Sequence, residues 1–433
     1  MAPTVERLKS LLSRYFPEKS IAGNAAQIYV IQFFSILAGV LSGIIIARVL
    51  GPAEKGVYNL YTVLGSFIGE IGMLGIGYGF LYQLANKNAP LEKVHGSALV
   101  FSLGMGGVTA LAGWAGLPLL RPYLPGLQDW MILLPFWLSP ATYYVNIWPY
   151  FMIGANQAVH SYRINLVIAL ATLAATSTLW LTGRLTAASM IWTAAGVSVL
   201  NCLVAFNVIT RIRRGLGFDR DLLRHSLSYG FILYVAALAN VIHFKVDQVM
   251  VNYWLGADAV GVYALSVFWA EKLFLLDGAL LAASLHRISS TSHQESSRVT
   301  NKVFRAQLLI SGLGGLALAV LAYPLVMLLY GEAYRGAILP LVVLIPGIIA
   351  WSLSKVHSGM LNYNHGLGAF VARVAILGSL TNILLNALFL GVLHWGITAS
   401  AAASSLSYIL VAVIIFGKSK QISHPGGEEI PGS

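Results

Sequence analysis

Long stretches without a charged residue constrain the fold of this sequence more than any other feature. No Asp, Glu, Lys or Arg occurs in residues 94–120, 130–162, 185–210 or 374–417. A helix of about 20 apolar residues is long enough to cross the hydrocarbon core of a bilayer. Only 10% of the residues are charged, whereas an ordinary soluble domain carries roughly 25%. The sequence therefore predicts an all-α protein that crosses the membrane many times.

Apolar segments of spanning length predict about twelve transmembrane helices. They lie near residues 24–47, 57–84, 96–120, 130–154, 162–182, 187–210, 226–253, 260–285, 304–324, 337–357, 371–392 and 397–416. Most Lys and Arg residues fall on one side of the membrane if the amino terminus is cytoplasmic, and an excess of positive residues marks the cytoplasmic side. Both termini are therefore expected in the cytoplasm. This topology, with contact to anionic lipids, explains the net charge of +11, and we expect no binding to nucleic acid.

An internal repeat gives the clearest sign of domain organisation. Residues 50–60 read LGPAEKGVYNL and residues 255–265 read LGADAVGVYAL, with matching residues at a constant offset of 205. Both copies fall in the predicted outer hairpin between the first and second spans of a group of six, where their tyrosines, Tyr58 and Tyr263, suit the bilayer interface. Repeats that share one orientation are related by an axis along the membrane normal. The predicted parts are an interfacial amphipathic helix at 1–20, six-helix lobes at 21–211 and 226–417, a basic cytoplasmic linker at 212–225 and a cytoplasmic tail at 418–433.

The first copy of the repeat also carries a resemblance to a known family. The run IIIARVLGPAEKGVYNLYTVLGSF at residues 44–67 is similar to the first-hairpin signature of polysaccharide flippases. These form the O-antigen (Wzx-type) branch of the multidrug/oligosaccharidyl-lipid/polysaccharide (MOP) exporter superfamily. Asp247, placed before the second hairpin, and the segment LHRISS at 285–290 also resemble the family, although many members have a proline near that segment and this sequence does not.

The resemblance implies a function as well as a fold. It implies two six-helix lobes in the bacterial cytoplasmic (inner) membrane that flip an undecaprenyl-diphosphate-linked oligosaccharide to the outer leaflet by alternating access. The expected partners are this substrate, membrane lipids, a coupling ion (H⁺ or Na⁺) and polysaccharide-assembly proteins. The alternatives are a multidrug/cation antiporter of the same superfamily and a membrane polysaccharide polymerase. We expect no catalytic residues, cofactor or metal site, since no such motif occurs and Cys202 is the single cysteine.

Charged residues inside the predicted spans are the candidates for function, because a charge in the bilayer is costly unless it faces protein or water. Lys245 and Lys272 are predicted to face a central cavity and to bind the pyrophosphate of the substrate. The family resemblance adds Arg48 as a third cation. Snorkelling to the lipid headgroups is the competing interpretation for Arg48.

Three carboxylates are candidates for ion coupling or gating. Asp247 is the best single one, and it shares a helix face with Asn240 and His243. Glu271 lies in the eighth span, and Glu70 lies in the glycine-rich stretch 69–79 of the second. That stretch predicts either a bendable gating helix or close helix packing. For the charged residues in general, the alternative is mutual neutralisation by ion pairs between helices.

Aromatic and amide side chains supply the last group of candidates. Trp137, Tyr144, Trp148 and Asn240 are predicted to contact the sugar or the lipid tail, with packing against neighbouring helices or lipid as the alternative. Serine and asparagine stripes in the last two spans predict hydrogen bonds between helices.

Overall fold

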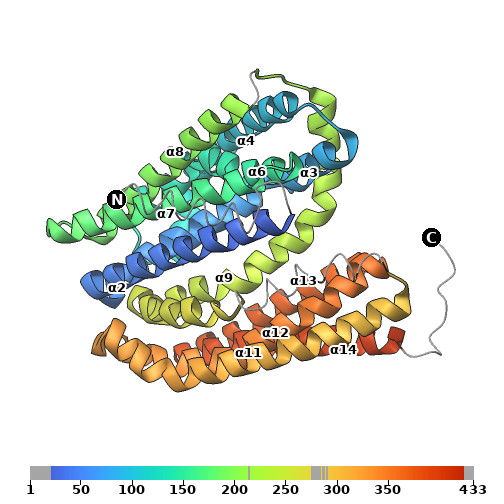
Figure 1. Ribbon diagram of the computed structural model, residues 1–433. Helices are drawn as coiled ribbons and strands as arrows, with labels where there is room; N and C mark the ends of the chain where they lie inside the picture. The colour runs from blue at the N-terminus through green and yellow to red at the C-terminus, as the bar shows by residue number, and fades with distance from the viewer. Residues whose placement is uncertain (1–20, 213–214, 275–283, 285–287, 289–290, 424–433) are drawn as a thin grey trace, which may run out of the picture. The chain divides into compact units, whose positions relative to one another are not determined.

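The chain folds into a set of long helices, shown in the computed structural model of Figure 1. The structure describes residues 21–212, 215–274, 284, 288 and 291–423. The predicted interfacial helix at 1–20 and most of LHRISS lie outside the described residues. The α-helices are α2 (Ile21–Met73), α3 (Ile76–Lys87), α4 (Leu91–Leu120), α5 (Asp129–Trp137), α6 (Ser139–Gly154), α7 (Ala158–Leu181), α8 (Ala187–Ile212), α9 (Arg220–Ala270), α11 (His293–Leu329), α12 (Ile338–Gly359), α13 (Gly368–Asn386) and α14 (Ile397–Ser423). Short helical turns, η1 (Arg121–Tyr123), η2 (Glu332–Ala337), η3 (Met360–Asn364) and η4 (Ala387–Val392), complete the described elements.

Eight helices in this part of the chain are long and apolar enough to cross a membrane, and the bent pair Arg220–Phe231 and Leu233–Ala270 raises the number to nine. The prediction of an all-α, multi-pass protein is confirmed. The number differs from about twelve because α2 runs on through two predicted spans and because α5 and α6 divide the fourth. The predicted eighth span continues into residues 275–283, which are not described.

Glycine kinks divide the two longest helices at equivalent positions of the repeat. The backbone of Gly51 in α2 has φ 69° and ψ 178°, and that of Gly256 in α9 has φ 85° and ψ 174°. A positive φ of this kind is readily adopted only by glycine. The repeat therefore encodes the same turn twice, which bends each helix into a hairpin.

Two compact units emerge from the contacts within the chain. Unit 1 comprises residues 1–49, 71–117 and 130–233, and unit 2 comprises residues 50–70, 118–129 and 234–433. Two segments of the amino-terminal half, 50–70 and 118–129, thus belong to unit 2 together with the second copy of the repeat.

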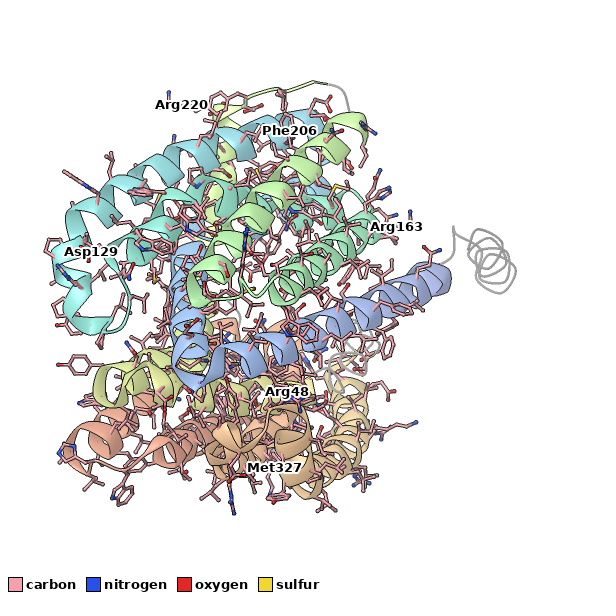
Figure 2. All side chains as sticks on the ribbon, turned by 90° about the vertical axis from the view of Figure 1, so that its left-hand side faces the viewer. Arg48, Asp129, Arg163, Phe206, Arg220 and Met327 are labelled. Carbon is pink, nitrogen blue, oxygen red and sulfur yellow. The ribbon has the colours of Figure 1, made fainter. Side chains whose placement is uncertain are left out.

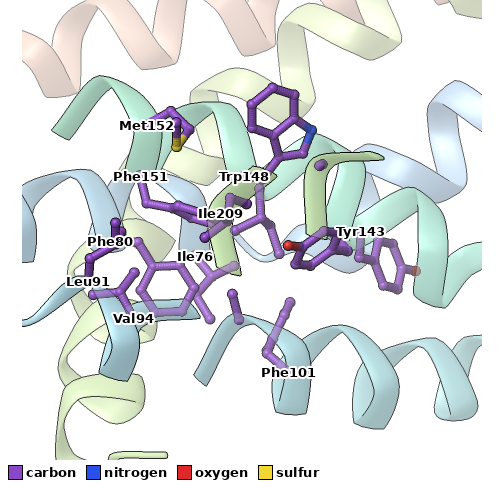
Figure 3. Packing of buried hydrophobic residues seen from close by; sticks show 14 of the residues in the cluster. Ile76, Phe80, Leu91, Val94, Phe101, Tyr143, Trp148, Phe151, Met152 and Ile209 are labelled. Carbon is purple, nitrogen blue, oxygen red and sulfur yellow. The ribbon is translucent and has the colours of Figure 1, made fainter. Parts of the chain in front are cut away.

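Unit 1 has its core where α3, α4, α6 and α8 meet the beginning of α9. Large buried side chains, among them Phe80, Tyr143, Trp148 and Phe151, fill this core (Figure 3). The glycine-rich stretch 69–79 contributes to this core because its glycines let neighbouring side chains approach the helix backbone closely. A Cβ on Gly72 would overlap the Tyr143 ring, which therefore packs directly on the backbone of α2. Small residues at such contacts let helices pack closely in membranes.

A helix break interrupts the same stretch. Leu74 and Gly75 have φ values of 47° and 72°, which end α2 at Met73 and restart the chain as α3. A Cβ on Gly79 would overlap the backbone of Ser226, and one on Gly230 would overlap the carbonyl of Gly75. Close packing thus accounts for these glycines, while the break supplies the bend that the sequence predicts.

The end of the basic linker is anchored to the start of α4. The Gly217 amide donates to the carbonyl of Glu92 at 3.1 Å. Lys93 forms an ion pair with Asp219 at 3.0 Å. The Asp219 carboxylate also accepts from the amides of Asp221 and Leu222, at 3.1 and 3.0 Å, and so caps the beginning of α9.

Unit 2 is built on α11, α12, α13 and α14, which run side by side (Figure 1). α12 packs against both α11 and α14, and α13 packs against α14. Close approach again depends on glycine, since a Cβ on Gly347 of α12 would overlap Ser405 of α14. Hydrogen bonds from Ser379 of α13 and Ser404 of α14 to α9 bring the polar faces of these three helices together.

Candidate functional site: a buried carboxylate and a half-buried basic cluster

Asp247 is the centre of a buried polar network in unit 2. Its side chain is 2% exposed. Its Oδ2 accepts from the Tyr263 hydroxyl at 2.6 Å and from the Ser404 hydroxyl at 3.0 Å. Its Oδ1 accepts from the Gln248 amide at 2.8 Å. Three donors around one buried carboxylate are what an ionised aspartate needs in place of water.

One chain of hydrogen bonds behind Ser404 points toward the carboxylate. The Ser400 hydroxyl donates to Asn386 Oδ1 at 2.6 Å, and Asn386 Nδ2 donates to Asn382 Oδ1 at 2.9 Å. Asn382 Nδ2 donates to the Ser404 hydroxyl at 3.1 Å, and Ser404 donates to Asp247. Aligned hydrogen bonds of this kind polarise one another. The network therefore presents a string of donors that ends on a single negative charge.

His243 joins the network from the same face of α9. Its Nε2 lies 2.8 Å from the Ser407 hydroxyl, and that hydroxyl donates to the carbonyl of Ser404 at 2.8 Å. Ser407 therefore accepts from His243, which assigns the proton of the neutral ring to Nε2. The ring is fully buried, with Trp351 and Tyr408 at centroid distances of 5.1 and 4.7 Å.

Helix periodicity explains why these residues meet. Asn382 and Asn386 are one turn apart on α13, and the three serines are spaced by four and three residues on α14, so each set forms a stripe. The predicted hydrogen bonding between the last two spans is present in both stripes. Ser379 extends the α13 stripe and donates to the carbonyl of Ala239 in α9 at 2.6 Å.

A second group of charges lies near the end of α9. Lys245 Nζ lies 3.3 Å from Glu271 Oε1, and these two side chains are 30% and 29% exposed. Lys272 Nζ lies 4.1 Å from the centroid of the Phe268 ring. The interhelical ion pair that the sequence suggested thus forms between Lys245 and Glu271. Asp247 has no ion-pair partner of this kind in the described part of the chain, and its charge is stabilised by hydrogen-bond donors.

The other predicted site residues are distributed over both units. Arg48 is exposed and lies just before the Gly51 kink of α2 (Figure 2). Glu70 and Asn240 are half-buried. Trp137 is 53% exposed, whereas Tyr144 and Trp148 are each 1% exposed in the core of unit 1. A sugar would therefore not reach those two rings in this conformation.

Sequence reasoning missed the role of Tyr263. The side chain of this tyrosine is fully buried inside the protein, and its hydroxyl reaches Asp247. The two residues are sixteen apart in the sequence, and this spacing does not define one helix face because the Gly256 kink lies between them. The sequence did hold one signal for this contact. Both copies of the repeat have the tyrosine, but only the second copy has an acid, Asp247, at the position where the first copy has Ser42.

These features define a class of protein, a multi-pass helical membrane protein with ionisable groups held inside its spans. Among the described residues, no three or more His, Cys, Asp or Glu side chains are grouped as a metal site would require. In membrane proteins such intramembrane charges mark pathways for ions or substrates.

Comparisons with known proteins identify the family. The sequence matches the family described as "Polysaccharide biosynthesis protein" over residues 45–339, and the chain belongs to this family. No curated protein sequence matches it.

Solved structures establish the fold. An inward-facing multidrug resistance MATE family transporter of the MOP superfamily is 14% identical with a TM-score of 0.74, covering 90% of this chain and 94% of that one. Lipid II flippase MurJ in an inward closed conformation is 15% identical with a TM-score of 0.71, covering 92% of this chain and 89% of that one. A MOP superfamily transporter from Pyrococcus furiosus is 11% identical with a TM-score of 0.60, covering 93% and 96%. The predicted MOP fold is confirmed.

Proposed function

We propose that the protein is a flippase that moves an undecaprenyl-diphosphate-linked oligosaccharide from the cytoplasmic to the outer leaflet of a bacterial inner membrane. The family supports a role in polysaccharide biosynthesis, and the fold is that of MOP transporters. The proposed topology has both termini in the cytoplasm, with lobes at 21–211 and 226–417. Membrane lipids and polysaccharide-assembly proteins are the proposed partners.

The observation that carries the proposal is the separation of the deep charges into two environments. Asp247 is enclosed by its donors, whereas Lys245, Glu271 and Lys272 keep part of their surface free. The charge accessible at this cluster is therefore positive. A positive site suits the diphosphate of a lipid-linked sugar. A transporter of cationic drugs would need the opposite sign, which argues against the multidrug/cation antiporter.

A reconstitution experiment separates these two functions. Purified protein in liposomes is supplied with fluorescently labelled undecaprenyl-diphosphate oligosaccharide, and in a parallel assay with a cationic dye. The proposal predicts movement of the lipid-linked sugar and no gradient-driven movement of the dye. Dye extrusion without movement of the sugar lipid would establish the antiporter.

Lys245 and Lys272 are proposed to bind the diphosphate. Replacing either with Ala removes a charge-assisted contact worth about 1.5–3 kcal/mol, so flipping should fall by roughly tenfold or more. Lys420→Ala, at an exposed position near the end of α14, is the matched control. If cells that carry Lys245→Ala and cells that carry Lys272→Ala both export surface polysaccharide fully, with normal amounts of the protein, neither lysine has this role. Arg48 is proposed as an additional cation, and Trp137 and Asn240 as contacts to the sugar or lipid.

Asp247 is proposed to couple flipping to an ion gradient. If Asp247 takes up a proton, or if a sodium ion approaches it, the donors now directed at the carboxylate must rearrange, and such a change could bias the conformational equilibrium. Asp247→Asn keeps the shape and removes the charge. We expect a folded protein whose flipping no longer depends on pH or sodium. Unchanged gradient dependence would exclude Asp247 and leave Glu70 or Glu271 as the next candidates.

A further inference from the structure

Loop 118–129 brings an aromatic ring onto α9 just before the second hairpin. Tyr123, in η1, stacks on Tyr253 of α9, with ring centroids 5.8 Å apart and an angle of 29° between the ring planes. Tyr123 is 53% exposed and Tyr253 is 48% exposed. Both residues belong to unit 2. About half of the surface of this stacked pair is therefore free of protein.

Trp254 forms a corner with the stacked pair. Its ring lies 5.2 Å from the Tyr253 ring, centroid to centroid, and the two planes meet at 82°. The indole also lies against the backbone of η4, because a Cβ on Gly391 would be 2.9 Å from it. Trp254 is half-buried. Two aromatic neighbours therefore position the exposed ring of Tyr253.

Polar contacts hold the loop that carries Tyr123. Asn252 Nδ2 donates to the carbonyl of Pro125 at 3.1 Å, which attaches the loop to α9. Within the loop, Arg121 forms an ion pair with Asp129 at 3.4 Å, and Arg121 lies in the same short helical turn as Tyr123. A ligand therefore meets rings and charges that are already ordered, which favours binding.

Membrane depth alone does not explain these aromatic residues. Tyrosine and tryptophan are common where a protein crosses the membrane–water interface. The same depth would apply to the first copy of the repeat, which falls in the equivalent outer hairpin. There, at the offset of 205 residues, the positions of Tyr253 and Trp254 are occupied by Arg48 and Val49. The aromatic pair is therefore specific to the second copy, where loop 118–129 supplies the third ring.

A sugar ring fits this combination of groups. The C–H groups on one face of a pyranose pack against the negative face of an aromatic ring. Its hydroxyl groups donate to a carboxylate and accept from a guanidinium. Asp129 and Arg121 offer these two groups, and their side chains are 47% and 69% exposed. A lipid acyl chain could use the rings but has no group for the ion pair.

We propose that Tyr123, Tyr253 and Trp254 form an outer platform on which sugar rings of the transported oligosaccharide stack, with Arg121 and Asp129 binding their hydroxyl groups. This inference rests on the proposed flippase function and adds a contact for the sugar chain away from the predicted cation site. In the proposed topology the platform lies at the outer face of the membrane. It therefore receives the oligosaccharide as the sugar chain leaves the transporter.

Saturation-transfer NMR on the full-length protein in detergent tests the platform. Maltotetraose, mannotetraose and tetra-N-acetylchitotetraose serve as soluble probes, since stacking depends on the face of a sugar ring more than on the identity of the sugar. We expect saturation to reach the ring protons of at least one probe. Tyr253→Ala should weaken binding of that probe by about threefold to tenfold, because one aromatic contact is lost.

Two further variants separate stacking from folding and from contact with detergent. Tyr253→Phe keeps the ring and should bind the probe as wild type does. Tyr323→Ala removes a tyrosine of α11 that is 55% exposed, and it should leave binding unchanged. If no probe receives saturation from the wild type, or if Tyr253→Ala binds as wild type does, the platform is overturned.

Flipping of undecaprenyl-diphosphate N-acetylglucosamine by the same preparation in liposomes tests the proposed function separately. Flipping by the wild type without saturation transfer would overturn the platform and leave the flippase function standing. Saturation transfer that depends on Tyr253, without any flipping, would support sugar stacking and overturn the transport role on which the inference rests.

Discussion

Gly56 and Gly261, the equivalent glycines of the internal repeat, each face the backbone of the other copy. A Cβ on Gly56 would overlap the carbonyl of Ala257, and a Cβ on Gly261 would overlap the carbonyl of Pro52. Pro52 and Ala257 are themselves equivalent at the same offset of 205 residues. The contact is therefore reciprocal, and the two hairpins are related locally by a two-fold axis.

Reciprocal packing predicts that an added methyl group is tolerated at neither glycine. Gly56→Ala and Gly261→Ala should each destabilise unit 2 by about 1–3 kcal/mol, because the backbone opposite must move. Gly43→Ala is the matched control, since a Cβ there meets no atom within 4 Å. Thermal unfolding in detergent measures the effect. A melting temperature of Gly261→Ala equal to that of Gly43→Ala would contradict the close contact.

Two polar side chains of the first copy reach α9 at these hairpins. Lys55 Nζ donates to the carbonyl of Gly261 at 3.2 Å, and Asn59 Nδ2 donates to Gln248 Oε1 at 2.6 Å. The equivalent residues of the second copy, Val260 and Ala264, are apolar. The symmetry of the backbone is thus combined with an asymmetric set of side chains, as it is around Asp247.

That asymmetry leads to a second prediction, for the two repeat tyrosines. Tyr263→Phe removes a hydrogen-bond donor from a buried carboxylate and should lower the free energy of unfolding by about 1.5–3 kcal/mol. Tyr58→Phe makes the same change in the first copy of the repeat, where Ser42 stands in the place of Asp247. We therefore expect Tyr58→Phe to lose less stability than Tyr263→Phe. Because Ser404 and the Gln248 amide still donate to Asp247, Tyr263→Phe should remain folded. Equal melting temperatures for the two variants would show that the bond to Asp247 contributes little.

Much of the fold follows from the sequence because bilayers restrict the possibilities. Charge-free runs predict helices, and the repeat predicts paired hairpins, whose glycines both adopt a positive φ. The exact position of the break at Leu74 was not predicted, because the apolar run continues through it and tertiary contacts decide where the backbone departs from a helix.

The candidate site could be predicted only in its components. Spacing along α9 groups His243 with Asp247, but it does not say which helix faces them. The contacts of Asp247 with Tyr263 and Ser404, and of Lys245 with Glu271, cross a turn or join separate helices.

The anchor of the linker predicts a dependence of stability on pH. Hydrogen bonds from the Leu222 amide and from Lys93 lower the pKa of Asp219 below its usual value. A carboxyl group with a lowered pKa stabilises the folded state above its unfolded pKa of about 4, and this contribution is lost as the pH falls through the folded pKa. Asp219→Asn should therefore be less stable than wild type at pH 7, and the difference should shrink toward pH 3. Melting curves recorded between pH 3 and pH 7 measure this difference in stability. A difference that stays constant with pH would show that the charge of Asp219 does not stabilise the beginning of α9.

Loop 118–129 provides a direct test of the contacts around the second hairpin. Asn252 Nδ2 donates to the carbonyl of Pro125 at 3.1 Å, and a Cβ on Gly126 would lie 3.4 Å from the Cβ of Ala257. Disulfides join Cβ atoms about 3.5–4.5 Å apart, so Gly126→Cys with Ala257→Cys, in a Cys202→Ala background, should crosslink under oxidation. The left-handed backbone of Gly126, with φ 90°, opposes a side chain there, so each single cysteine variant serves as the control for folding.

The crosslink also reports on transport. Alternating access requires the outer ends of the helices to separate, and the loop and the hairpin are both outer segments in the proposed topology. If they separate during the cycle, oxidation should abolish flipping in liposomes and a reductant should restore it, while neither single variant responds. Mass spectrometry quantifies the disulfide in the same samples. Full flipping by completely crosslinked protein would show that loop 118–129 and the second hairpin move together as one body.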